Sequence, residues 1–217
     1  MVRPTYDIPQ RTIIFTPQSE ASLYLCEQDE DMAAIIDAVG EVRLDIEADG
    51  FISLARAICD QQISIHAAKA IWGRLVQRCE GEVSAETLSL LDEEELRACG
   101  FSARKASYLH DLATKTLDGT LDFEQLARLD DEAIIEKLVC VKGIGRWTAE
   151  MFLIFALERP DVFALDDGGL RRSVCRLKGF ESNAPKELIE LVSEQWAPCR
   201  SCAALYLWRW MSDLPMS

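Results

Sequence analysis

Apolar residues recur at intervals of three and four along most of this chain, and this spacing limits its fold more than any other feature. Such spacing gives an α-helix one apolar face. The stretches that show it are short: the one from Asp29 to Val39, for example, is followed at once by Gly40. Many short amphipathic helices with almost no strand pattern predict an all-α protein.

One short stretch departs from this pattern. Residues 12–16 include Ile13, Ile14 and Phe15, whose β-branched and aromatic side chains favour a short N-terminal β element, and we expect no other strand. A glycine-rich break at residues 143–145 interrupts the helical pattern. We therefore expect two helical lobes with a cleft between them.

Helix starts are marked locally by residues that can cap them. Ser64 and Ser102 each precede an apolar periodic stretch, and a serine hydroxyl at that place can accept a hydrogen bond from a free amide of the first turn. We expect Ile65 on the inner face of the helix that follows Ser64. Asp130 or Asp131 is expected to cap a helix that ends near residue 140.

Charge is unevenly distributed over the 217 residues. The formal net charge of −14 argues against a protein that coats nucleic acid by bulk electrostatic attraction. Residues 138–178, however, hold seven basic residues against five acidic ones, whereas residues 1–50 hold three against eleven. The stretch that departs from the acidic background is thus the one that contains the glycine-rich break.

The sequence gives no sign of membrane insertion or secretion. No apolar run approaches the roughly 18–20 residues that span a bilayer. Residues 1–10 lack a basic segment followed by an apolar one. We expect no membrane partner, and a location in the cytoplasm and nucleoid of a prokaryote or in the nucleus of a eukaryote.

The eight cysteines are expected to be reduced and mostly buried, because most lie inside apolar helical patterns. Cys199 and Cys202 form the single CxxC pair. Two ligands do not complete a tetrahedral zinc site, and His66 and His110 lack zinc-finger spacing. Packing is therefore a better interpretation of this pair than metal binding or redox chemistry, and we expect no zinc.

The string LVCVKGIGRWTAE contains the most informative motif. Gly143 and Gly145 allow a tight turn and a close approach of another surface. The first amides of the helix that begins at Arg146 lack an acceptor within the helix, so a phosphate oxygen is a natural ligand for them. Ile144 would fill the gap between the helices, while Lys142 and Arg146 flank the turn. The whole string resembles the helix-hairpin-helix motif, which binds the DNA backbone, and an ordinary glycine corner is the alternative.

A pair of aspartates follows this motif. Asp166 and Asp167 precede a helix expected from about Leu170 to Lys178. An aspartate at a helix start is more often an N-cap than a catalyst. Because there are two, one can cap the helix while the other faces the cleft.

Here the sequence resembles a known family. The strings GIGRWTA and DVFALDD match, without a gap, the pattern of the helix-hairpin-helix plus Gly/Pro-Asp (HhH-GPD) superfamily of DNA glycosylases, and within it the 3-methyladenine DNA glycosylase II family. The likeness covers roughly residues 51 to 210. It makes Asp167 the expected catalytic carboxylate, with Asp166 as the alternative. Leu165 stands where that family often has a proline, which loosens the match slightly.

The resemblance also implies an arrangement of domains and roles for individual residues. We expect an N-terminal segment (1–50) packed with the C-terminal lobe, a central helical lobe (51–140), a helix-hairpin-helix (138–158) and C-terminal helices with the catalytic aspartate (159–217). The walls of the base pocket are expected at Trp147, Trp208 and Tyr206. A wedge that fills the gap left by the flipped nucleotide is expected at Gln62 or Ile63. DNA contacts are expected at Lys142, Gly143, Ile144, Gly145, Arg146, Thr148, Arg171 and Arg172.

Two absences separate this chain from other members of the superfamily. Bifunctional members carry a Schiff-base lysine two residues after the second hairpin glycine, where this chain has Trp147. Iron–sulfur members carry four C-terminal cysteines, where this chain has two. We therefore expect neither lyase activity nor a cluster. The family also suggests a structural Na⁺ or K⁺ on the backbone of Val139, Val141 and Ile144.

The predicted function is that of a monofunctional glycosylase. The substrate would be double-stranded DNA carrying alkylated bases such as 3-methyladenine or 7-methylguanine, and a carboxylate would stabilise the positive charge that develops on the deoxyribose. The protein is expected to be a monomer. A non-catalytic DNA-binding module stays open as an alternative, as does a glycosylase for hypoxanthine, oxidised bases or alkylated pyrimidines.

Overall fold

The computed structural model describes residues 11–213. Within that range the chain forms thirteen helices and two strands. In chain order these are β1 (Arg11–Phe15), α1 (Glu20–Gln28), α2 (Glu30–Val39), β2 (Val42–Ile46), α3 (Gly50–Asp60), α4 (Ile65–Arg78), α5 (Ala85–Leu90), α6 (Glu93–Cys99), α7 (Ala103–Leu117), α8 (Phe123–Leu126), α9 (Asp131–Val139), α10 (Arg146–Phe155), α11 (Gly168–Lys178), α12 (Lys186–Glu194) and α13 (Arg200–Asp213). The predicted helical class is confirmed, and so is the short N-terminal β element.

The chain divides into two compact units. The first combines residues 11–46 with residues 153–213, and the second comprises residues 47–152. Helix α10 begins in the second unit and ends in the first. Among residues 11–213, no helix is both long enough and apolar enough to span a bilayer. The expected lack of a secretory signal concerns residues 1–10, which lie outside the described residues.

The first unit contains an antiparallel strand pair. Phe15 of β1 lies opposite Val42 of β2, and Arg11 lies opposite Ile46. The prediction of a single strand is therefore wrong. A lone strand would leave its backbone amides and carbonyls without partners, and β2 supplies them. Its buried residues Val42, Leu44 and Ile46 alternate with two less buried polar ones.

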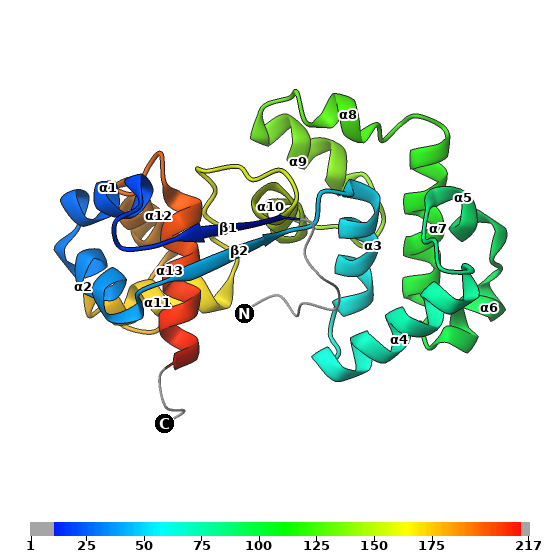
Figure 1. The fold of residues 1–217 in the computed structure, drawn as a ribbon, viewed down its shortest axis with the longest axis horizontal. Coiled ribbons are helices and arrows are strands. Elements are labelled where there is room, and N and C mark those ends of the chain that lie inside the picture. Colours follow the sequence, from blue (N-terminus) through cyan, green and yellow to red (C-terminus); the bar gives the residue numbers. More distant parts are fainter. Residues whose placement is uncertain (1–10, 214–217) are drawn as a thin grey trace. The chain divides into compact units, whose positions relative to one another are not determined.

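Helix α13 forms much of the core of the first unit. It packs against α1, α2, α11 and β2, and Figure 1 shows the two strands and α11 beside it. Every residue from Ser201 to Trp208 is buried. Next to the start of α13, the indole of Trp196 donates a hydrogen bond to Asp29, the N-cap of α2 (2.9 Å). Asp29 also accepts from the Lys178 ammonium (2.7 Å), so this buried carboxylate joins three elements.

Helix α7 occupies the centre of the second unit. It packs against α3, α5 and α6. The predicted caps are confirmed, since Ser64 accepts from the Ala67 amide and Ser102 from the Lys105 amide. Of the two aspartates expected at α9, Asp130 is the cap. Ile65 was expected to be buried but is 51% exposed, because its place in the first turn of α4 leaves it beyond the packed face.

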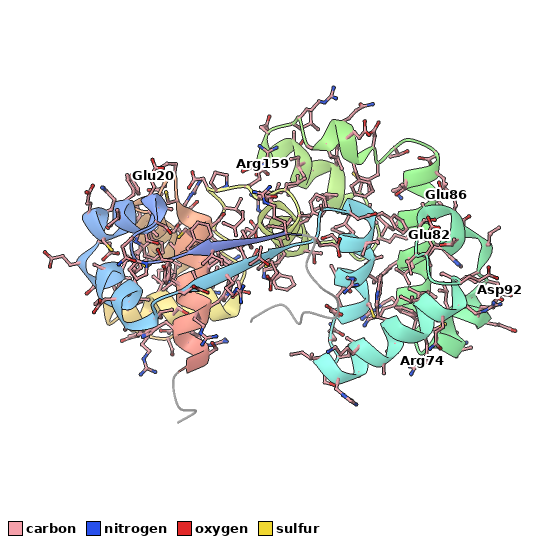
Figure 2. All side chains as sticks on the ribbon, viewed as in Figure 1. Glu20, Arg74, Glu82, Glu86, Asp92 and Arg159 are labelled. Carbon is pink, nitrogen blue, oxygen red and sulfur yellow. The ribbon has the colours of Figure 1, made fainter. Side chains whose placement is uncertain are left out.

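Carboxylates gather at one end of this second unit. Glu82, Glu86 and Asp92 are exposed around α5 and the start of α6 (Figure 2). Figure 1 places α9 and α10 away from these helices within the unit. Part of the negative charge of this unit is therefore concentrated away from the glycine-rich turn.

Candidate active site and nucleic-acid interface

The glycine-rich turn (residues 141–146) joins α9 to α10 in the second unit. Gly143 has a φ of +80°, a conformation that side chains other than glycine rarely adopt. A Cβ built there would lie 2.1 Å from a ring carbon of Tyr108. Both the backbone and the packing therefore require glycine at this position. Ile144, predicted to fill the gap between the helices, is buried at 4% exposure, and Val141 is buried at 1%.

Gly145 differs from Gly143. It is exposed, its φ lies outside the left-handed region, and a Cβ added to it would meet nothing within 4 Å. Its carbonyl accepts the hydrogen bond from the Ala149 amide (3.0 Å), so it directly precedes the first turn of α10. The packing of the protein does not explain this glycine. Its bare backbone leaves room for an external group at the positive end of a helix.

The cations beside the turn have carboxylate partners. The Arg146 guanidinium forms a bidentate pair with Glu132 (2.7 and 2.8 Å), and its Nε donates to Glu150 (3.1 Å). The hydrogen bond from Arg146 lowers the pKa of Glu132, and the same bond raises the pKa of Arg146. Lys142 is exposed, and its backbone amide donates to Asp111 (2.8 Å). These carboxylates offset part of the positive charge that the sequence predicted here.

A second segment approaches the turn within the same unit. The side-chain amide of Gln61 donates to the carbonyl oxygen of Gly143 (2.8 Å). Gln62 follows with a φ of +57° and is exposed, whereas Ile63 is half-buried. The structure thus brings the predicted wedge segment next to the predicted phosphate-binding turn, although the two are about eighty residues apart in sequence.

Asp167 is the N-cap of α11 in the first unit. Its Oδ1 accepts from the Leu170 amide (2.8 Å) and from the indole N–H of Trp208 (3.1 Å), and the residue is only 6% exposed. Asp166 is exposed and forms an ion pair with Lys186. The sequence suggested that one aspartate would cap the helix while the other faced the cleft. The structure gives the cap to Asp167, the residue expected to be catalytic.

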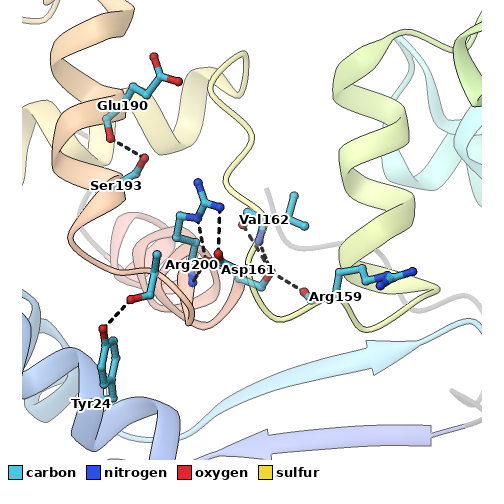
Figure 3. Close-up of polar contacts among 9 residues, drawn as sticks. Tyr24, Arg159, Asp161, Val162, Glu190, Ser193 and Arg200 are labelled. Atoms are coloured by element: carbon cyan, nitrogen blue, oxygen red, sulfur yellow. Dashed lines mark hydrogen bonds and ion pairs between the residues drawn. The ribbon is translucent and has the colours of Figure 1, made fainter. Parts of the chain in front are cut away.

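The loop that leads to Asp167 is fixed at the start of α13 (Figure 3). Arg200 forms a bidentate pair with Asp161 (2.7 and 2.9 Å). The Ser201 hydroxyl donates to the Arg159 carbonyl (2.6 Å) and accepts from the Val162 amide (3.0 Å). Trp208, two turns further along the same helix, then holds the Asp167 side chain. One helix therefore positions both ends of this loop.

Comparison with known proteins decides the family. Residues 55–198 match the model of the HhH-GPD superfamily base excision DNA repair proteins. The chain belongs to this superfamily. It is 36% identical over 211 residues to DNA-3-methyladenine glycosylase 1 of Schizosaccharomyces pombe, covering 94% of this chain and 92% of the relative. The predicted membership of the 3-methyladenine glycosylase family is confirmed.

Solved structures agree with this assignment. The fold is similar to that of a DNA-3-methyladenine glycosidase from Bacillus halodurans, with a TM-score of 0.84, 37% identity and 91% of each chain covered. It is also similar to the S. pombe 3-methyladenine DNA glycosylase Mag1 in complex with abasic DNA, with a TM-score of 0.81 and 37% identity. That match covers 90% of this chain and 98% of the other.

Within this HhH-GPD chain, the three expected pocket aromatics have different surroundings. Trp147 lies in the first turn of α10 and is 36% exposed. Trp208 is 5% exposed and stacks on Phe155, with ring centroids 5.9 Å apart and an interplanar angle of 26°. Tyr206 is fully buried, where its hydroxyl lies 3.1 Å from that of Ser22 and donates to Gly40 (3.2 Å).

These surroundings change the expected roles. Burial raises the pKa of Tyr206, and its contacts are those of a core residue. Residues two apart on a helix point in nearly opposite directions, so Tyr206 and Trp208 lie on different faces of α13. Trp208 holds the Asp167 carboxylate, which the sequence did not predict. Trp147 is the most exposed of the three.

The remaining predicted contacts are only partly accessible. Thr148 is 7% exposed. Arg171 is half-buried and donates to the Ala184 carbonyl (3.2 Å), whereas Arg172 is exposed. Of the carbonyls expected to hold a monovalent cation, that of Val141 already accepts from the Ile144 amide (3.1 Å). The cation site stays a prediction.

Five of the eight cysteines are buried, Cys26 and Cys199 are half-buried, and Cys140 is exposed. All eight lie within the described residues, and none forms a disulfide. Burial raises the pKa of Cys202 to about 12 and also raises that of Cys199, so both thiols are protonated at neutral pH. In residues 11–213 no group of three or more His, Cys, Asp or Glu side chains is arranged to hold a metal ion.

Sequence reasoning missed several residues that shape the site, namely Gln61, Tyr108, Asp111 and Glu132. Each contacts the turn or its flanking cation from another element of the second unit. No local motif marks such residues, because each owes its role to a neighbour between 14 and 82 residues away. The one available signal was the polar Asp-Gln-Gln stretch at the end of α3, from which Gln62 and not Gln61 was chosen as a candidate.

Proposed function

We propose that this chain is a monofunctional DNA glycosylase that everts alkylated bases from duplex DNA and hydrolyses their N-glycosidic bond. The observation that carries the proposal is the buried Asp167 carboxylate, which accepts hydrogen bonds from the Leu170 amide of α11 and the Trp208 indole of α13. The relatives named above as 3-methyladenine glycosylases support the substrate class. The proposed partner is duplex DNA with damaged bases, bound by a monomer in the nucleoid or nucleus.

The chemistry suits a fixed carboxylate. Cleavage of the bond to the base develops positive charge on the deoxyribose, and a preorganised anion near C1′ stabilises that charge electrostatically. The same carboxylate can orient or deprotonate the attacking water. Purines alkylated at N3 or N7 are cationic and leave as neutral molecules. Their departure needs no general acid.

The residues of the turn supply the proposed grip on the DNA backbone. The exposed Gly145 and the first amides of α10 offer N–H groups to a phosphate oxygen. Trp147 follows at once and offers an electron-rich face to a cationic base, a contact worth about 0.5–2 kcal/mol. Because an indole has no amine to form a Schiff base, we propose that an abasic site stays uncut after base release.

The experiment is single-turnover release of free base from a duplex that contains N-methylpurines. Asp167→Asn keeps an oxygen that can accept the Leu170 and Trp208 hydrogen bonds but removes the charge, and we expect the rate to fall about 10²- to 10⁴-fold. Asp166→Asn is the matched control. It removes the same charge at the adjacent exposed position, and we expect a near wild-type rate.

Each alternative has its own outcome. A wild-type protein that binds duplex without releasing base would be a non-catalytic module. Release of hypoxanthine, oxidised bases or alkylated pyrimidines, identified by chromatography, would change the substrate class. If Asp166→Asn abolished base release while Asp167→Asn did not, Asp166 would be the catalytic carboxylate.

A further inference from the structure

Gln62 has an unusual backbone conformation. Its φ of +57° lies in the left-handed region, where a residue with a Cβ is strained by roughly 1–2 kcal/mol. The residue is exposed, so no burial of its own side chain offsets that strain. Such a conformation persists only when the surrounding structure holds it.

Two tethers hold the chain just before Gln62. Gln61 is the C-cap residue of α3, and its side-chain amide donates to the Gly143 carbonyl (2.8 Å). The Lys105 ammonium donates to the Cys59 carbonyl (2.6 Å), one of the last carbonyls of α3. A cation at the carboxyl end of a helix is favourable, because those carbonyls lack partners within the helix.

One face of α7 contacts both this loop and the glycine-rich turn. Lys105 holds the end of α3, Tyr108 lies against Gly143, and Asp111 accepts from the Lys142 amide. These residues are three apart, a spacing that places them on neighbouring positions of the helix surface. Helix α7 thus acts as a common base for the two segments, and Gln61 joins them directly.

We propose that Gln61 is a positioning residue that fixes the exposed Gln62 to the phosphate-binding turn, so that the wedge and the backbone grip move as one rigid element. The proposal rests on the proposed base eversion. Eversion of a paired base costs a few kcal/mol, and a wedge that is fixed before binding loses less conformational entropy when it enters the duplex. A base that is already unpaired needs no wedge.

The test compares one lesion in two settings. Single-turnover release of 7-methylguanine is measured from a duplex and from the same strand without its complement. Gln61→Met removes the N–H donor at similar size and without a change of charge. We expect its duplex rate to fall about 3- to 10-fold, the value of one hydrogen bond, while the single-strand rate stays unchanged.

Two further variants isolate the mechanism. Gln77→Met is the matched control, since Gln77 is exposed on α4 of the same unit, and we expect wild-type rates in both settings. Gln62→Ala removes the proposed wedge side chain. If Gln61 acts through Gln62, adding Gln61→Met to Gln62→Ala should not lower the duplex rate further, a non-additivity that a double-mutant cycle measures.

Hydrogen exchange separates this inference from the proposed function. We expect the amides of residues 61–64 to exchange faster in Gln61→Met than in wild type. Unchanged exchange would overturn the tether, and an equal loss of rate on both substrates would show a merely structural role. A wild-type protein that releases no base would refute the proposed function, while the exchange measurement would still decide whether Gln61 fixes the loop.

Discussion

We expect the two glycines of the turn to respond differently to the addition of one methyl group. Gly143→Ala places a Cβ 2.1 Å from the Tyr108 ring at a φ of +80°. The left-handed backbone costs about 1–2 kcal/mol for alanine, and the displaced ring adds about 1–3 kcal/mol of overpacking. The unfolding free energy should therefore fall by about 2–5 kcal/mol.

Gly145→Ala should leave the fold nearly intact. Its Cβ meets nothing within 4 Å, and its φ is not left-handed, so the cost is about 0.5–1 kcal/mol for alanine at the start of a helix. A phosphate that approaches this bare backbone would meet the new methyl group. The hydrogen bond to this charged phosphate would be lost, so the Kd for duplex DNA should rise about 10- to 100-fold.

Two measurements distinguish these effects. Urea denaturation gives the unfolding free energy, and fluorescence anisotropy with a duplex that carries an abasic analogue gives the Kd at fixed ionic strength. Gly73→Ala is the control, because Gly73 is exposed within α4 with nothing near its Cβ position, and it should gain about 0.5–1 kcal/mol. A Gly145→Ala protein that binds as tightly as wild type would refute the close approach of a phosphate. A fully stable Gly143→Ala would refute the steric argument.

Three other changes test the polar contacts. Trp208→Phe removes the indole donor of Asp167, so single-turnover base release should fall about tenfold; an unchanged rate would show that the bond does not position the carboxylate. Glu132→Gln removes the bidentate partner of Arg146, so duplex binding should tighten about 2- to 5-fold and depend more steeply on salt. An unchanged affinity would argue against a phosphate contact by Arg146. The pKa of Asp29 is lowered, because burial, which alone would raise it, is outweighed by the hydrogen bonds from Lys178 and Trp196. The Asp29 charge therefore stabilises the fold at pH values above the ordinary carboxyl pKa. This stability is lost as the pH falls through the lowered pKa. Asp29→Asn should lower the unfolding free energy by about 3 kcal/mol at neutral pH. The difference from wild type, measured by urea denaturation, should disappear in acid.

Features with partners close in sequence were predictable. The caps of Ser64 and Ser102 and the tight turn at Gly143 were correctly expected, because each depends on hydrogen bonds or dihedral angles within about four residues. The family followed from the same property, since its two defining strings are continuous in sequence. The second strand was missed even though Val42 to Ile46 alternates, because its partner lies some thirty residues earlier.

Sequence alone therefore determined the helical class, the family, the glycine turn and the pair of aspartates that contains the candidate carboxylate. Only the tertiary structure decided that Trp208 holds Asp167, that Tyr206 belongs to the core, and that Gln61 joins the loop of α3 to the turn. The physical reason is the distance in sequence between the interacting residues. Helical periodicity and capping act over one turn, whereas these contacts join residues 41, 184 and 82 positions apart and form only when packed elements bring them together.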